Sequence, residues 1–128
     1  MKFGKALGVL TAAVAVPLVM TGTAYADIPF GQNRNGDASF YTDRGTGSCG
    51  SPIDASSQML VAVSRSYWTS SNPNNDPLCG ASVEVKYKGK TIKVPVRDQC
   101  PSCGPNKIDL SRPAFGQLAD TQRCQISP

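Results

Sequence analysis

Hydrophobic and polar residues alternate most regularly in residues 82–97. Apolar side chains at positions 83, 85 and 87 alternate with charged ones, and a second alternating run follows after Lys88, Gly89 and Lys90. A period of two indicates strands with one buried face, and a glycine between two such runs indicates a hairpin turn. Pro95 has no backbone N–H, so we expect it at a sheet edge or a bulge.

Shorter patterns predict the elements on the N-terminal side of this hairpin. Residues 38–41 and the apolar run 58–64 are expected to be short strands, the second of them buried. Residues 44–50 are rich in glycine and predict a turn between them. Residues 69–77, TSSNPNNDP, have no large apolar side chain and predict an exposed loop.

A short helix is expected after the hairpin. Ser111 is a suitable N-cap, and Pro113 falls in the first turn, where its missing N–H costs little. Phe115, Leu118 and Ala119 have the i, i+3, i+4 spacing of one buried helical stripe.

The N-terminus has the pattern of a secretory leader. Two lysines precede an apolar run over residues 6–20, and small residues at positions 24 and 26 predict cleavage after Ala26. The run is shorter than the roughly 20 residues that span a bilayer, so a membrane anchor is disfavoured. We therefore expect a signal peptide at 1–26, a flexible Gly/Asn/Pro-rich arm at 27–36 and one small domain at 37–128.

Charge and cysteine content narrow the class of protein. The chain has 13 Lys and Arg against 9 Asp and Glu, and two of the lysines lie in the leader, so the charge is too mild to predict nucleic-acid binding. In an exported domain of this size the five cysteines predict a disulfide framework. Structural zinc usually takes two closely spaced ligand pairs, and only Cys100 and Cys103 form one. We therefore expect no metal.

The sequence contains no histidine. A cysteine or serine nucleophile needs a base or a cationic neighbour, so a protease or transferase activity is disfavoured. The remaining candidates for chemistry are two acidic residues, Asp98 at the end of an alternating strand and Asp109 in a short Ile-Asp-Leu run. No cofactor is expected.

Five segments in order carry a family resemblance: GDASFY at 36–41, GSCG at 47–50, CG at 79–80, VRDQC at 96–100 and IDLS at 108–111. Together they resemble the secreted double-psi β-barrels of the rare lipoprotein A-like, barwin-like and expansin-like families. The resemblance implies a mainly β fold, a six-stranded barrel with one or two short helices. Cys124 stands where the family has a glycine before its closing strand, so we expect that strand to be cut short.

Barwin-like relatives imply a Cys49–Cys79 disulfide. Cys100 would then close on Cys103, and Cys124 would stay free. In lytic relatives an aspartate at the position of Asp98 is thought to act as an acid, with a histidine nearby. Because this chain lacks the histidine, we favour a structural role for the groove carboxylates Asp98 and Asp109, and a sugar-binding groove without catalysis remains the alternative.

Among these families the arrangement most resembles the secreted papain inhibitors of Streptomyces. The resemblance implies a secreted, non-enzymatic and monomeric inhibitor of papain-like cysteine proteases, with no membrane attachment after cleavage. A stiff loop on a rigid barrel would block the protease cleft. The alternative is a cell-wall or polysaccharide-binding module.

The expected protease contact is the polar loop, with Trp68 as a possible anchor. Tyr67 and Trp68 allow two interpretations, an exposed aromatic platform or a ring that caps the barrel core. The expected contact residues are Trp68, Asn72, Pro73, Asn74, Asn75 and Asp76.

The same resemblance implies a secreted transglutaminase as a cross-linking partner. Gln32 lies between Gly31 and Asn33 in a segment without periodicity, so it is the candidate for modification. Gln58 and Gln99 fall beside predicted strands and are expected to be held more tightly. A solvated glutamine in a tail is an equally good interpretation of Gln32.

Overall fold

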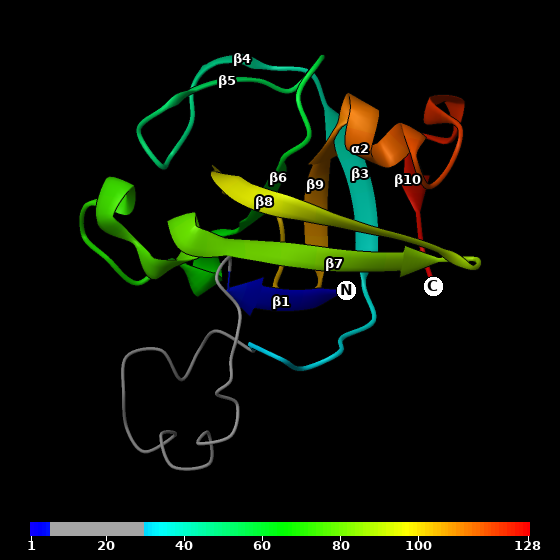
Figure 1. Cartoon of the computed structure of the whole chain (residues 1–128), viewed down its shortest axis with the longest axis horizontal. Helices are drawn as coiled ribbons and strands as arrows, with labels where there is room; N and C mark the ends of the chain where they lie inside the picture. The colour runs from blue at the N-terminus through cyan, green and yellow to red at the C-terminus, as the bar shows by residue number, and fades with distance from the viewer. Residues whose placement is uncertain (6–29) are drawn as a thin grey trace.

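The alternating run forms the hairpin that its pattern predicts. Strands β7 (Ala81–Tyr87) and β8 (Lys90–Cys100) pair antiparallel from Ser82↔Pro95 to Tyr87↔Lys90 in the computed structural model, which describes residues 1–5 and 30–128 (Figure 1). Lys88 and Gly89 both have positive φ, 46° and 82°, as the tightest hairpin turns require.

β8 continues past the hairpin and links two parts of the sheet. Its residues Val96 to Cys100 pair in parallel with β6 (Val61–Ser64), with a register shift between Val61 and Ala62. Pro95 is exposed and lies where pairing with β7 ends and pairing with β6 is about to begin. Asp98 therefore lies inside a strand, and not at its end as the sequence pattern indicated.

Among the described residues, the main sheet has seven strands in the order β1-β7-β8-β6-β9-β3-β10. β3 and β9 pair in parallel, and β6 and β9 pair antiparallel. The further strands are β1 (Lys2–Lys5), β3 (Asp37–Tyr41), β9 (Lys107–Ser111) and β10 (Gln125–Ile126). β4 (Arg44–Thr46) and β5 (Pro52–Asp54) form a separate two-stranded sheet.

The core lies under the hairpin and against the short helix. Val61, Val63, Val83, Val94 and Leu110 are fully buried in it. α2 (Arg112–Gly116) begins after Ser111, as predicted, but the Oγ of Ser111 accepts from Leu60 N at 3.2 Å instead of capping the helix. The helix ends at Gly116, so the buried Phe115 lies in it and the buried Leu118 lies just beyond it. Four 3₁₀ helices complete the described elements: η2 (Arg65–Tyr67), η3 (Pro73–Asn75), η4 (Pro77–Gly80) and η5 (Thr121–Arg123).

The mainly β architecture agrees with the prediction, and several details differ from it. Residues 44–50 contain β4 as well as a turn, because Arg44 to Thr46 find a partner strand in 52–54. Residues 58–60 precede the strand, and Met59 is 38% exposed. The closing strand, by contrast, is cut short as expected, because β10 has two residues.

The strand count differs from the predicted six because β1 joins the sheet. Lys2–Lys5 pairs antiparallel with β7, although this segment has the sequence of a leader. Residues 6–29, which include the rest of the predicted signal peptide and the start of the arm, lie outside the described residues. Cleavage after Ala26 stays a prediction. In the part of the chain that is described, no helix has the length and apolar character needed to cross a membrane.

Candidate functional site

Both predicted acidic residues lie across from one small residue at the centre of the sheet. Ala62 of β6 is in register with Asp98 of β8 on one side and with Asp109 of β9 on the other, and Asp109 is in register with Ser39 of β3. Residues directly opposite on paired strands point to the same face. We call Ser39, Tyr41, Asp98 and Asp109 the carboxylate face.

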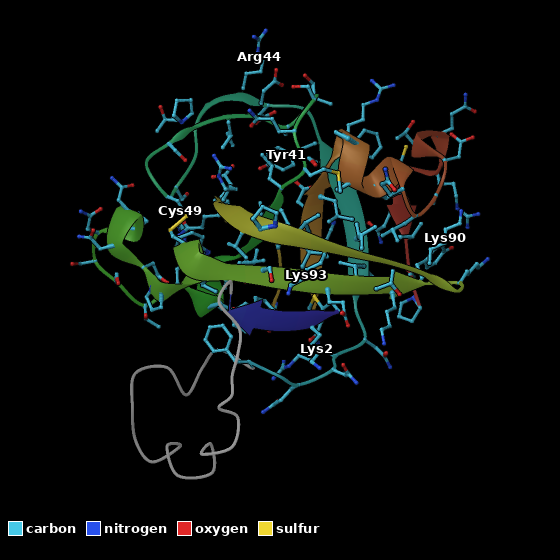
Figure 2. The ribbon with its side chains drawn as sticks, in the orientation of Figure 1. Lys2, Tyr41, Arg44, Cys49, Lys90 and Lys93 are labelled. Carbon is cyan, nitrogen blue, oxygen red and sulfur yellow. A yellow bond between two sulfur atoms is a disulfide. The ribbon has the colours of Figure 1, made fainter. Side chains whose placement is uncertain are left out.

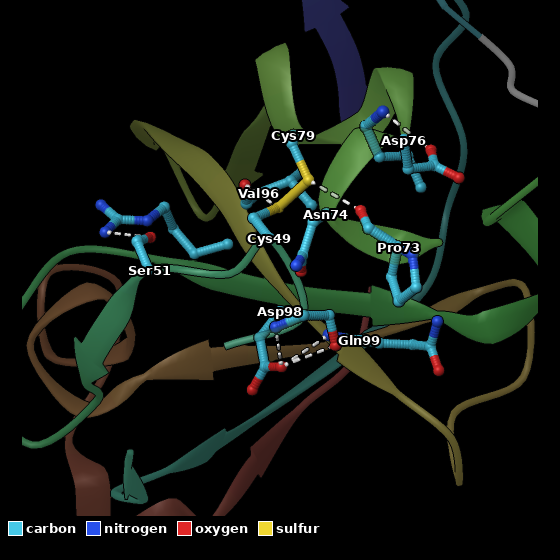
Figure 3. Close-up of a disulfide and its surroundings, with 12 residues drawn as sticks. Cys49, Ser51, Pro73, Asn74, Asp76, Cys79, Val96, Asp98 and Gln99 are labelled. Atoms are coloured by element: carbon cyan, nitrogen blue, oxygen red, sulfur yellow. Dashed lines mark hydrogen bonds between the residues drawn. A yellow bond between two sulfur atoms is a disulfide. The ribbon is translucent and has the colours of Figure 1, made fainter. Parts of the chain in front are cut away.

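Asp98 accepts four hydrogen bonds. Tyr41 Oη donates to its Oδ2 at 3.0 Å. Its Oδ1 accepts from the backbone N and the Oγ of Ser48, each at 3.1 Å, and from Gln99 N at 2.9 Å (Figure 3). Three of these donors converge on Oδ1 and the fourth binds Oδ2, so both oxygens of the carboxylate accept from groups of the protein itself. This arrangement is that of a structural acceptor that anchors the turn at 47–50 onto β8.

The other groups of this face are partly buried, and burial is the largest influence on the pKa of Tyr41 and on that of Asp109. Burial raises the pKa of Tyr41 well above its ordinary value, and the neighbouring charge of Asp98 adds to the effect. Burial also raises the pKa of Asp109, and a hydrogen bond from Ser39 Oγ at 3.1 Å offsets part of that shift.

The carboxylate face offers hydroxyl and carboxylate groups but no nucleophile with an activating base. Such groups suit hydrogen bonding to the hydroxyls of a sugar. Within residues 1–5 and 30–128 there is no cluster of three His, Cys, Asp or Glu that could hold a metal ion. Sequence reasoning missed Ser39, Tyr41 and Ser48, and the i, i+2 spacing of Ser39 and Tyr41 along a strand was the available signal.

Both disulfides have the predicted connectivity. Cys49 is joined to Cys79, with 5.6 Å between their Cα atoms, and Cys100 is joined to Cys103. Cys124 is free and exposed, at a positive φ of 63°. Its backbone conformation is the one that the family's glycine supplies with less strain.

The polar loop, residues 69–77, lies beside the Cys49–Cys79 disulfide (Figure 3). Asn72, Asn74 and Asn75 are exposed, and Pro73 is partly exposed. A Cβ added at Gly50 would lie 2.8 Å from the side chain of Asn74, so the loop packs closely on the turn at 47–50. The disulfide therefore holds the base of the loop, and packing on the turn at 47–50 holds its tip.

Asp76 differs from the other residues predicted to make contacts. It is 3% exposed, and its carboxylate accepts from the backbone N of Thr69 at 2.7 Å, of Ser70 at 2.8 Å and of Leu78 at 2.9 Å. A buried carboxylate with three internal donors fixes the shape of the loop. Asp76 thus supports the loop from inside, which leaves the asparagines to face solvent.

The two aromatic residues before the loop have separate roles. Tyr67 is 4% exposed, and its hydroxyl donates to Pro105 O at 2.7 Å, so this ring belongs to the core. Trp68 is partly buried against the same core, and its Nε1 donates to Val63 O at 3.4 Å. The capping interpretation applies to Tyr67, and part of the Trp68 ring remains at the surface beside the loop.

The glutamines also differ in their surroundings. Gln32 is exposed in the arm, whereas Gln99 is half-buried and its Oε1 accepts from Arg65 Nε at 3.1 Å. Gln58 is exposed in a turn, not at a strand edge, and its Oε1 accepts from Asp54 N.

A shallow hollow of about 430 Å³ lies elsewhere, between Tyr87 and Ile126.

Comparison with known proteins places these features in a family. Residues 33–127 match the DPBB_1 family model, described as "Lytic transglycolase". The chain is 56% identical over 119 residues to a protein named papain inhibitor from Streptomyces mobaraensis, covering 92% of this chain and 82% of that protein. It is also 39% identical over 83 residues to an Asp f 7 allergen homologue from Arthroderma benhamiae, covering 65% of this chain and 28% of the homologue.

Solved structures show the same fold. The structure of Streptomyces papain inhibitor is similar with a TM-score of 0.77 and 59% identity, over 79% of this chain and 93% of that one. A Clavibacter michiganensis expansin mutant in complex with cellohexaose is similar with a TM-score of 0.59 and 30% identity, over 72% of this chain and 46% of the expansin. The chain therefore belongs to the DPBB_1 family, the double-psi β-barrels of the rare lipoprotein A-like and barwin-like group.

Proposed function

We propose that this protein is a secreted, non-enzymatic inhibitor of papain-like cysteine proteases. The observation that carries the proposal is the 56% identity to the Streptomyces mobaraensis papain inhibitor, which extends over 82% of that protein. The histidine-free sequence supports a binding role over a catalytic one. We infer that the secreted product lacks residues 1–26 and is a monomer whose barrel keeps the six strands β7, β8, β6, β9, β3 and β10.

The proposed mechanism is steric blocking of the protease cleft by the polar loop. Three features support it: Asp76 holds the loop from inside, the Cys49–Cys79 disulfide ties its base, and Asn72, Asn74 and Asn75 are exposed. A loop that is already ordered loses little conformational entropy on binding. The exposed part of the Trp68 ring, directly before the loop, supplies an apolar anchor of the kind that dominates many interfaces.

A second candidate function is glycan binding on the carboxylate face. It is favoured by the row of Ser39, Tyr41 and Asp109 hydroxyl and carboxyl groups and by the similarity to an expansin that was solved with cellohexaose. This function would use a surface on the sheet, distinct from the polar loop, so the two functions are separable by mutation.

We propose further that Gln32 is a substrate for a secreted transglutaminase. Its exposure in the arm supports this role, since the enzyme needs an extended glutamine. The side chain of Gln99 is less available because it is bonded to Arg65.

Two assays on the same purified protein test the choice of function. Inhibition is measured on papain that has been reduced and freed of excess reductant, so that the inhibitor's disulfides stay intact. Binding is measured by sedimentation with insoluble peptidoglycan and by titration with cellohexaose. We expect stoichiometric loss of papain activity. Retention on glycan with full papain activity would favour the second candidate, and release of soluble glycan would contradict a non-enzymatic role.

A further inference from the structure

The N-terminal strand β1 occupies a position on the edge of β7, here called the slot, that cleavage of the leader would leave empty. Lys2–Lys5 covers the edge of β7, with Phe3 in register with Val83, and lies beside that long strand in Figure 1. Phe3 is 1% exposed and its ring centroid lies 5.1 Å from that of Tyr67. Lys2, on the alternate position, is exposed (Figure 2). β1 is thus a core-forming strand.

Removing β1 would leave two defects in the secreted product. The edge of β7 over residues 81–84 would lose its partner, and an exposed strand edge invites pairing with another chain. The core would also lose a whole buried phenylalanine side chain beside Tyr67, which is among the most destabilising losses that a core can suffer. Both defects call for a replacement strand that carries an aromatic residue.

The arm already lies next to the slot and has the required sequence. Gly31 N donates to Phe3 O at 3.0 Å, and Arg34 N donates to Met1 O at 2.9 Å, so residues 30–34 run along the free side of β1. Phe30 forms a bridge with Phe3 and packs against the main core. The leader carries Lys2-Phe3-Gly4-Lys5 and the arm carries Pro29-Phe30-Gly31-Gln32, so both place Phe-Gly at this level of the sheet.

We propose that, after cleavage, residues 30–33 of the arm replace β1 on the edge of β7 and that Phe30 enters the space left by Phe3. The proposal rests on the predicted cleavage after Ala26. The arm moves sideways by one strand spacing, about 4.8 Å. Residues 34–36, which span about 10 Å when extended, connect it to the fixed strand β3. The uncleaved chain and the secreted product therefore use different aromatic side chains for the same core position.

The test compares two variants in two forms of the protein. Phe3→Ala and Phe30→Ala are made in the full chain with cleavage blocked and in the product secreted with its own leader, whose N-terminus is verified by mass. We expect Phe3→Ala to lower the Tm of the full chain, and Phe30→Ala to lower that of the secreted product, each by at least about 10 °C. Phe30→Ala should shift the full chain by less than half as much. Phe30→Leu should restore most of the loss.

Controls distinguish arm docking from the other ways to fill the slot. Asn35→Ala, at an exposed position of the segment that connects the arm to β3, should change the Tm of neither form. Amides of residues 81–84 should stay protected from hydrogen exchange in the secreted product and lose protection in its Phe30→Ala variant. Equal effects of Phe30→Ala in both forms, a dimer that protects these amides, or a secreted product that retains residues 1–26 would overturn the proposal. Papain inhibition is scored separately, so its failure leaves this test intact.

Discussion

Ser48 donates two hydrogen bonds to one oxygen of Asp98, from its backbone N and from its Oγ, each 3.1 Å long. The next residue, Cys49, is bonded to Cys79 at the base of the polar loop. Asp98 therefore orients the turn that supports this loop, although the carboxylate itself lies on the carboxylate face. The residue that lytic relatives are thought to use as an acid here links two surfaces of the barrel.

We expect Asp98→Asn to reduce stability and to leave papain inhibition within about threefold of wild type. The amide can accept from Ser48 but replaces one acceptor oxygen with a donor, which costs about 1–3 kcal/mol in a partly buried network. Chemical denaturation and papain titration measure the two effects, with the exposed Asp43→Asn as control. Loss of inhibition in a variant with normal stability would place the functional surface at Asp98.

The Cys49–Cys79 disulfide should stabilise the fold more than the Cys100–Cys103 disulfide does. The first closes a loop across a sequence separation of 30 and the second across a separation of 3. The chain-entropy relation gives about 3.7 kcal/mol for the long loop and about 2 kcal/mol for the short one. Denaturation of the two double Cys→Ser variants tests the order, and equal losses would contradict it.

Asp109 should make the protein less stable as the pH rises. Its pKa is raised in the folded state, so the folded protein binds the proton more tightly than the unfolded chain does. The stabilisation by the proton is complete below the unfolded value near 3.8 and is lost as the pH rises through the higher folded pKa. Asp109→Asn removes this pH dependence. The Tm of the variant minus that of the wild type should therefore be more positive at pH 7 than at pH 3, by about a few degrees. If the Tm difference between variant and wild type is the same at both pH values, Asp109 makes no such contribution.

Transglutaminase labelling with a small amine should modify Gln32 first. Gln32 is exposed in the arm, whereas the side chain of Gln99 is bonded to Arg65. Peptide mapping after brief labelling locates the sites, and Gln32→Asn should abolish the earliest one. Incorporation at Gln99 with none at Gln32 would contradict the assignment.

Local patterns predicted the elements whose partners are close in sequence. Alternation around Gly89 gave the hairpin, and Ser111 with Pro113 gave the start of α2. The β4–β5 pair was missed because its short, glycine-containing strands have no alternating pattern. β1 could not be predicted, since a leader sequence is expected to leave the protein and Phe3 becomes a core residue only through its pairing with β7.

The candidate site depends more strongly on contacts between distant segments. The resemblance supplied Asp98, Asp109 and both disulfides, but a sequence pattern does not show which hydrogen bonds a carboxylate accepts. Asp76 illustrates the limit: a loop rich in Asn, Ser and Pro indicates exposure, yet two backbone N–H groups of that loop and the N–H of the following Leu78 converge on this one buried side chain. Tyr41 joined the site through its contact with Asp98, 57 positions away.

The most direct test of the central claim is the inhibition constant for papain, measured for the wild type and two matched loop replacements. One variant replaces residues 72–75 with Gly-Ser-Gly-Ser and keeps the buried Asp76 and the disulfide. The other places the same four residues at the exposed turn 56–59, and both must keep the fold by circular dichroism. We predict inhibition by the wild type and the control, and at least about tenfold weaker inhibition by the 72–75 variant. Equal inhibition by all three proteins would contradict the role of the polar loop, and no inhibition by the wild type would contradict the proposed function.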